Sequence, residues 1–384
     1  MTVNRMILNE TSYFGQGAIK EVANEAKKRG FKKALVVTDK DLLKFEVATK
    51  VIDILEEASL AYEIYDGIVP NPSIQAVQTG VEACQKAEAD YIIAIGGGSP
   101  IDTAKAIGII IENPEFSDVI SLEGVAETKN PALPILAVPT TSGTAAEVTI
   151  NYVITDTGNQ RKFVCVDPHD IPVVAFIDSD MMMGMPKGLC ASTGMDALTH
   201  AIEGFITKGA WEMSDMLHLK AIEIISRSLR DSVAGDQKGR EEMALGQYIA
   251  GMGFSNVGLG LVHGMAHPLS AWYNTPHGVA CATLLPLIMD FNKENTGEKY
   301  REIAIAMGIK DAVDMSLTDV RVATVNAVKQ LGIDVGIPQS LSELGMKAAD
   351  VEQVAKDAFR DVCTPGNPRE ASLEEIIELY KSML

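Results

Sequence analysis

The sequence predicts two domains of different class, an α/β domain over residues 1–185 followed by an all-α domain over residues 186–384. Apolar runs of strand length alternate with helical patterns in the first part, whereas the second part carries helical patterns and no convincing strand. A chain of 384 residues also exceeds the usual size of one hydrophobic core. We place the boundary at Met185-Pro186, where a methionine-rich stretch meets a proline.

The first domain is predicted to contain a mostly parallel sheet, because its short apolar runs end at polar or glycine residues and stand next to helical patterns. The runs that predict buried strands are 34–38, 91–95, 134–138 and 173–177. The neighbouring stretches with helical periodicity are 75–86 and 102–111. Alternation of this kind is typical of sheets covered by helices on their faces.

The second domain is predicted to be helical throughout, because its apolar residues recur with the 3.6-residue period of an amphipathic helix. The stretches that show this period are 213–233, 239–255, 294–308, 316–331, 347–361 and 373–383. We therefore expect the domain to form its core by packing helices on one another.

Composition excludes several kinds of partner. The 33 basic and 52 acidic residues give a net charge of −19, which repels the phosphates of nucleic acids and anionic membrane surfaces. No apolar run reaches the roughly 18 residues of a membrane span, and the polar start 1–5 lacks the core of a signal peptide. The 5 cysteines are scattered and show no CxxC spacing, which favours reduced thiols. We expect a cytoplasmic protein that binds neither nucleic acid nor membrane.

A glycine-rich turn follows the predicted strand that ends at Ile95. Gly96, Gly97 and Gly98 leave backbone N–H groups accessible at the start of a helix, where a pyrophosphate binds well. Ser99 is predicted to be the N-cap of this helix, with Pro100 at its first position. The simpler interpretation is a tight strand-to-helix turn without a ligand.

Two further features favour the nucleotide interpretation. Asp39 follows an earlier strand, where a carboxylate can bind the ribose 2′-hydroxyl and repel a 2′-phosphate, so that NAD is preferred over NADP. The loop 139–144 supplies hydroxyl groups after another strand, including those of Thr140 and Thr141. The chain has no GxGxxG motif, and the acidic residue precedes the glycines instead of following them. We therefore expect a Rossmann-like dinucleotide-binding domain with an unusual order of motifs.

The second domain carries a candidate metal site. Asp196 and His200 are four residues apart, as are His263 and His267, and this spacing places each pair on one face of a helix. With His277, they offer carboxylate and imidazole ligands that suit Fe²⁺ or Zn²⁺. We expect no thiolate near Asp196, His200, His263 and His277. His267 is predicted to carry a proton or support the ligands, with a packing role as the alternative.

These motifs together resemble the iron-dependent (group III) alcohol dehydrogenases over essentially the whole chain. The segments that carry the resemblance are 66–72, 96–99, 139–144, 196–200, 263–267 and 276–278. Three more segments resemble members that act on small aldehydes and diols, namely 4–10, 163–170 and 366–370. The resemblance implies an NAD-dependent enzyme that interconverts small aldehydes with alcohols or diols, lactaldehyde and 1,2-propanediol foremost.

The resemblance also implies roles for individual residues. Iron would be bound by Asp196, His200, His263 and His277. NAD would contact Asp39, Gly96, Gly97, Gly98, Ser99, Thr140, Thr141 and Lys162. The substrate pocket would include Asn71, Asn151, Phe254 and Cys363, of which the last two are equally compatible with ordinary packing. The family likeness further implies a homodimer.

Three other functions fit parts of this pattern. A zinc-dependent polyol dehydrogenase of the glycerol type would share the cofactor and reaction but differ in metal and substrate. A lyase similar to 3-dehydroquinate synthase would need several basic residues for its anionic substrate, and few Lys or Arg residues lie near the ligand motifs. A metal or nucleotide sensor without enzymatic activity is disfavoured by the presence of both a complete ligand set and a nucleotide loop.

Overall fold

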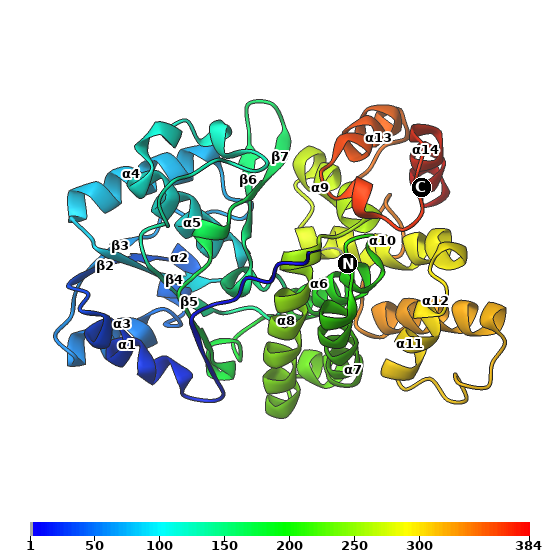
Figure 1. The fold of residues 1–384 in the computed structure, drawn as a ribbon, viewed down its shortest axis with the longest axis horizontal. Helices are drawn as coiled ribbons and strands as arrows, with labels where there is room; N and C mark the ends of the chain where they lie inside the picture. Colours follow the sequence, from blue (N-terminus) through cyan, green and yellow to red (C-terminus); the bar gives the residue numbers. More distant parts are fainter. Residues whose placement is uncertain (1–2) are drawn as a thin grey trace. The chain divides into compact units, whose positions relative to one another are not determined.

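The computed structural model describes residues 3–384. Contacts within the chain separate two compact units, which divide between Met185 and Pro186. The first unit contains the strands of the described chain, and the second is built from helices (Figure 1). The predicted combination of a parallel α/β unit with a helical unit is confirmed.

The first unit is organised around a six-stranded sheet of order β1-β8-β5-β4-β2-β3, in which every neighbouring pair is parallel. Its strands are β1 (Thr11–Phe14), β2 (Lys33–Val37), β3 (Ala61–Tyr65), β4 (Tyr91–Gly96), β5 (Ile135–Pro139) and β8 (Val174–Ile177). Its helices are α1 (Val22–Arg29), α2 (Lys40–Lys44), α3 (Thr49–Glu57), α4 (Ile74–Ala87) and α5 (Gly98–Glu112). The four predicted strands correspond to the buried central strands of this sheet.

The central strands are apolar on both faces because helices cover both sides. Val36 and Ile93 pack with residues of α1 and α3 on one face. Leu35 and Ile92 pack with residues of α4 and α5 on the other. Figure 1 shows the two helix pairs on opposite sides of the sheet. Consecutive residues of one strand thus contribute to two cores, which explains the unbroken apolar runs.

Four strands lack such runs and were not expected from the sequence. The edge strands β1 and β3 are partly exposed. A separate antiparallel hairpin, formed by β6 (Asn151–Asp156) and β7 (Arg161–Val166), alternates half-buried and buried residues along β6. Hydrogen bonds from the hairpin to α5 hold it in place, since Asp102 accepts from the backbone N–H of Val153 at 3.0 Å.

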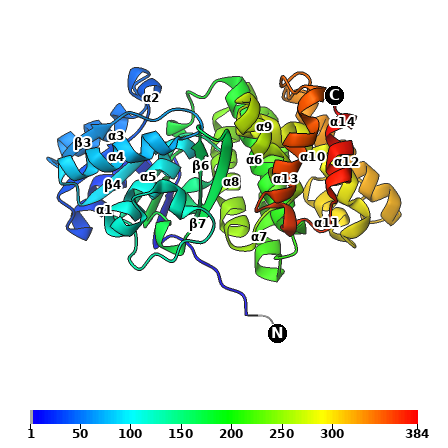
Figure 2. The ribbon, with the colours of Figure 1, turned by 90° about the horizontal axis from the view of Figure 1, so that it is seen from above.

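The second unit packs its helices around one large apolar core. Its helices are α6 (Lys187–Ile206), α7 (Glu212–Ala234), α8 (Gln237–Val257), α9 (Leu261–Tyr273), α10 (His277–Asn292), α11 (Lys299–Ala306), α12 (Leu317–Asp334), α13 (Val351–Arg360) and α14 (Leu373–Ser382). Helix α9 lies beside α10 and α13 (Figure 2). No helix within residues 3–384 is both long enough and apolar enough to cross a membrane.

Candidate metal centre and nucleotide-binding loops

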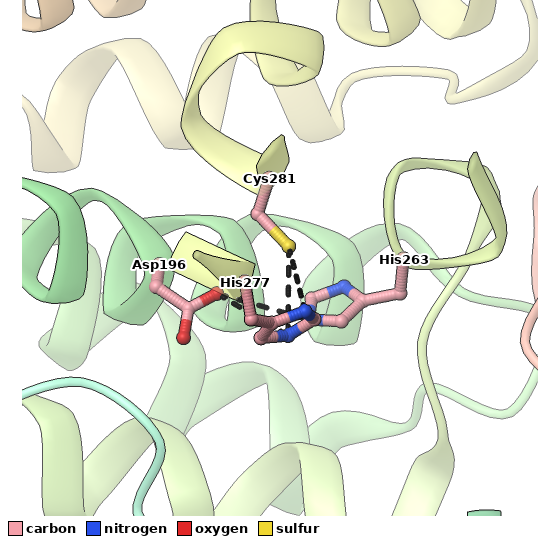
Figure 3. Close-up of side chains that lie close together, drawn as sticks. All are labelled: Asp196, His263, His277 and Cys281. Atoms are coloured by element: carbon pink, nitrogen blue, oxygen red, sulfur yellow. Dashed lines mark hydrogen bonds and ion pairs between the residues drawn. The ribbon is translucent and has the colours of Figure 1, made fainter. Parts of the chain in front are cut away.

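Three helices of the second unit bring three predicted ligands together. Asp196 comes from α6, His263 from α9 and His277 from the first position of α10. Asp196 is 0% exposed and His263 is 2% exposed. Figure 3 shows the carboxylate of Asp196 beside both imidazoles. Its Oδ1 atom lies 4.0 Å from Nε2 of His263 and 3.8 Å from Nε2 of His277.

The polar atoms of this group are suited to a cation. Within residues 3–384, both carboxylate oxygens of Asp196 and Nε2 of His263 are buried and have no hydrogen-bond partner. Buried polar atoms are normally paired, because leaving one unpaired costs free energy comparable to a lost hydrogen bond. A divalent ion would interact with all three atoms at once, so the residues fit a metal.

His200 lies one helical turn after Asp196 on α6, but its nitrogens are not in the group of ligand atoms that lie within 4.8 Å of one another. Its ring stacks on that of His263, with 4.7 Å between ring centroids. Its other face stacks on Phe254 at 4.2 Å. Phe254 is therefore a buried residue that packs against a predicted ligand.

The fourth member of the close group is Cys281, which lies one turn after His277 on α10. Its Sγ is 3.6 Å from Nε2 of His277. The expectation that no thiol lies near the ligands is therefore wrong. Four-residue spacing between His277 and Cys281 was the signal in the sequence, because it places both side chains on one face of a helix.

Glu203 supports His263 and was not expected from the sequence. The Oε2 atom of this buried carboxylate lies 2.6 Å from Nδ1 of His263. Its Oε1 accepts a hydrogen bond from the backbone N–H of Val262, at 2.7 Å, in the first turn of α9. Burial alone would lower the pKa of His263, but the hydrogen bond to Glu203 and its charge, together with the charges of Asp196 and Asp361, outweigh burial and leave the pKa raised. Glu203 thereby directs Nε2 of His263 toward Asp196.

His267 has a carboxylate partner of its own. Its Nδ1 lies 2.8 Å from Oδ2 of Asp361, and its ring stacks against that of His277 at 5.3 Å between centroids. Cys363 adjoins the pair, since its backbone N–H donates to Oδ1 of Asp361 at 2.8 Å. Burial foremost, and then the charge of Asp361, raise the pKa of the Cys363 thiol well above its ordinary value. Cys363 therefore stays a neutral thiol.

Comparison with known proteins agrees with this arrangement of ligands. A sequence profile described as iron-containing alcohol dehydrogenase matches residues 9–179. A profile for the C-terminal part of the Fe-containing alcohol dehydrogenase family matches residues 190–384. The chain belongs to this family. As an iron-containing alcohol dehydrogenase it is an oxidoreductase, and the group on α6, α9 and α10 is its candidate metal site.

Relatives and solved structures of this family match over the full length. Lactaldehyde reductase of Escherichia coli (strain K12) is 64% identical over 377 residues, which cover 98% of each chain. A solved 1,3-propanediol oxidoreductase superposes with a TM-score of 0.96 at 39% identity, and both chains are covered completely. Sulfoacetaldehyde reductase from Bifidobacterium kashiwanohense, solved in complex with NAD⁺, has a TM-score of 0.87 at 27% identity and covers 100% of this chain and 99% of its own.

The glycine turn of this alcohol dehydrogenase begins its helix earlier than predicted. The N-cap of α5 is Gly97, so Ser99 lies inside the helix and the predicted N-cap is wrong. The lack of a side chain permits this start, because a Cβ atom on Gly97 would lie 3.0 Å from Oγ1 of Thr141. Gly96 has φ +153°, and a Cβ there would meet Pro100 at 2.3 Å. The two loops predicted to bind nucleotide are thus in contact at the ends of β4 and β5.

The remaining predicted residues of the dehydrogenase occupy defined positions in the first unit. Asp39 is the N-cap of α2, and its Oδ1 accepts from the backbone N–H of Leu42 at 2.8 Å. Lys162 on β7 donates to Oδ1 of Asn71 at 2.7 Å. Asn151 begins β6, and its backbone carbonyl accepts from the buried Lys105 at 2.8 Å. Lys162, a predicted NAD contact, is therefore hydrogen-bonded to Asn71, a predicted substrate contact.

Proposed function

We propose that this alcohol dehydrogenase interconverts small aldehydes with alcohols or diols, with lactaldehyde and 1,2-propanediol as its main substrates, and that it uses NAD and Fe²⁺. The observation that carries the substrate assignment is 64% identity over 98% of the chain to a relative named lactaldehyde reductase. Because most aligned positions are identical over the full length, a shared substrate class is favoured.

Asp196, His200, His263 and His277 are the proposed iron ligands. The buried oxygens of Asp196, which lack hydrogen-bond partners within the described chain, and the orientation of His263 by Glu203 support a cation at this position. A divalent ion bound there would polarise an aldehyde oxygen, and a nicotinamide would exchange hydride with the carbonyl carbon. Burial of the ligands strengthens this polarisation, because water screens the charge less.

The NAD assignment rests on residues of the first unit. Asp39 follows β2, the glycine turn follows β4 and the threonine loop follows β5, so all three lie beyond carboxyl ends of parallel strands. Ligands of open parallel sheets bind at such ends. We assign NAD contacts to Asp39, Gly96, Gly97, Gly98, Ser99, Thr140, Thr141 and Lys162. A structural relative bound to NAD⁺ supports this cofactor.

Assignments for the substrate follow from the same likeness. We propose that Asn71, Asn151, Phe254 and Cys363 line the substrate pocket, and that His267 transfers the proton that accompanies hydride transfer. The contact between Asp361 and Nδ1 supports this role for His267, because a carboxylate on Nδ1 leaves Nε2 for proton exchange. We also propose that the protein is a cytoplasmic homodimer. Its 5 cysteines form no disulfide within the described chain, which is typical of a reducing compartment.

The test is an anaerobic assay of NADH oxidation with a series of small aldehydes, with metal content measured on the same sample. We expect turnover with lactaldehyde and about one bound iron per active chain. The matched variant His263→Ala should lose metal and turnover together while it keeps its helical content. Full turnover by metal-free His263→Ala protein would rule out the metal assignment, and turnover only with other aldehydes would rule out the substrate.

A further inference from the structure

We propose that Cys281 is a metal ligand, and that its thiolate forms with Asp196, His263 and His277 a second ligand set that favours zinc. This inference rests on the metal centre of the proposed function. The two sets share three residues and differ in the fourth, which is His200 for iron and Cys281 for zinc. The metal held by this chain would then depend on which of the two side chains binds.

The separations between the ligand atoms support a four-coordinate site. A tetrahedral zinc ion with ligands at about 2.0–2.3 Å holds its ligand atoms about 3.3–3.8 Å apart. The sulfur of Cys281 lies 3.6 Å from Nε2 of His277, and that nitrogen lies 3.8 Å from Oδ1 of Asp196. The same oxygen lies 4.0 Å from Nε2 of His263. All four ligand atoms lie within 4.8 Å of one another, so shifts of up to about 1 Å would place them around one ion.

The local structure keeps Cys281 in this group and His200 outside it. Cys281 is 0% exposed and lies on the face of α10 that carries His277. Figure 3 shows its sulfur pointing toward the imidazoles. His200 is stacked between Phe254 and His263 and would have to turn its ring toward the ion. The folded arrangement therefore favours the thiolate set.

The chemistry of the ligands gives a second reason. When Cys281 binds, its S–H bond breaks, the proton passes to water and a sulfur–metal bond forms. Within the four ligands, the carboxylate of Asp196 and the thiolate then balance a divalent ion, whereas in the set with His200 the remaining positive charge is balanced by the carboxylate of Glu203, 2.6 Å from Nδ1 of His263. Thiolate ligands also favour zinc, while imidazole and carboxylate ligands alone do not discriminate strongly.

Cobalt provides a direct test, because a thiolate bound to Co²⁺ gives a sulfur-to-metal charge-transfer absorption in the near ultraviolet. Metal-free protein is loaded anaerobically with Co²⁺, and bound cobalt is quantified. We expect the band in the native protein and its loss in Cys281→Ser, with cobalt still bound. Cys190→Ser is the matched control, because Cys190 is also buried in this unit and contacts Ser232 instead of the ligands. It should keep the band.

Other outcomes decide between the two proposals. Stoichiometric cobalt without the band in native protein would overturn the role of Cys281 and leave the metal centre intact. Failure of native protein to bind cobalt at all would overturn both. X-ray absorption of the zinc-loaded native protein needs no variant, and it should show one sulfur neighbour at about 2.3 Å. In a chelator competition, Cys281→Ser should bind Zn²⁺ at least about tenfold more weakly, with a smaller change for Fe²⁺.

Discussion

The carboxylate of Glu203 and the imidazole of His263, which are 60 positions apart in the sequence, are joined by a contact of 2.6 Å between Oε2 and Nδ1. The same carboxylate accepts the backbone N–H of Val262 at the start of α9. One buried side chain therefore fixes both the beginning of the helix and the ring of a proposed ligand on it. A carboxylate at this end of a helix also interacts favourably with the helix dipole.

Glu203→Gln should weaken metal binding without unfolding the protein. The amide oxygen can still accept the backbone N–H of Val262, but the amide no longer supplies a carboxylate to hold the proton on Nδ1 of His263. We expect metal affinity to fall about 10- to 100-fold. Chelator competition measures this loss, and the melting temperature of the metal-free protein serves as control. A large drop in that temperature with unchanged affinity would mean that Glu203 only caps the helix.

Asp361→Asn should slow turnover through His267. Asparagine keeps the oxygen that accepts the backbone N–H of Cys363, but it removes the negative charge that orients the imidazole. We expect kcat to fall by about tenfold or more, with metal content unchanged. A double-mutant cycle with His267→Gln is the measurement. If the two losses multiply in the double variant, Asp361 acts independently of His267.

Asp39→Gly should improve the use of NADP relative to NAD. The carboxylate would repel the 2′-phosphate of NADP, and glycine removes that charge. The ratio of kcat/KM for the two cofactors is the measurement, with Asp41→Gly as a control, because Asp41 lies two positions away on α2. Asp39 also caps α2, so the variant should be slightly less stable. If the ratio of kcat/KM for NADP and NAD does not change, Asp39 does not contact the ribose of the cofactor.

The burial of His218 predicts that the folded protein loses stability in acid. Its ring is fully buried on α7, and neither nitrogen has a hydrogen-bond partner within the described residues. Gly204 and Gly253 make room for it, since a Cβ atom on either would lie 2.3 Å from Nε2. Burial foremost, and then the charge of Lys299, lower the pKa of His218 from 6.5 to about 3. The folded protein therefore holds this ring neutral.

The sign of the effect follows from proton binding. Between pH 3 and pH 6.5 the unfolded chain binds a proton at His218 that the folded chain does not. The contribution of His218 to stability is thus fully present above this window and is lost as the pH falls, by up to about 1.4 kcal/mol per pH unit. Urea unfolding of native protein and His218→Phe across this range is the measurement. Phenylalanine cannot titrate, so parallel pH profiles for the two proteins would contradict the prediction.

Local patterns in the sequence were sufficient for the fold class and for three members of the close ligand group. Central strands such as β4 (Tyr91–Gly96) were recognisable because burial on both faces demands apolar side chains at every position. The spacing of Asp196 and His200, and of His263 and His267, was informative because helical geometry places residues four apart on one face. The edge strands and the β6–β7 hairpin were not predicted, because partly exposed strands do not need an apolar side chain at every position.

Only the tertiary structure decided which side chains meet the ligands from other elements. Asp361 lies 94 positions from His267, and no local period links them. The start of α5 at Gly98 likewise depended on Thr141 in a distant loop, which packs where a side chain would otherwise stand. The sequence by itself determined the central strands, the amphipathic helices and the residue types available for chemistry, because those depend on burial and short-range geometry. The partners of Glu203, Cys281 and Asp361 depended on how separate helices pack, which is a property of the whole core.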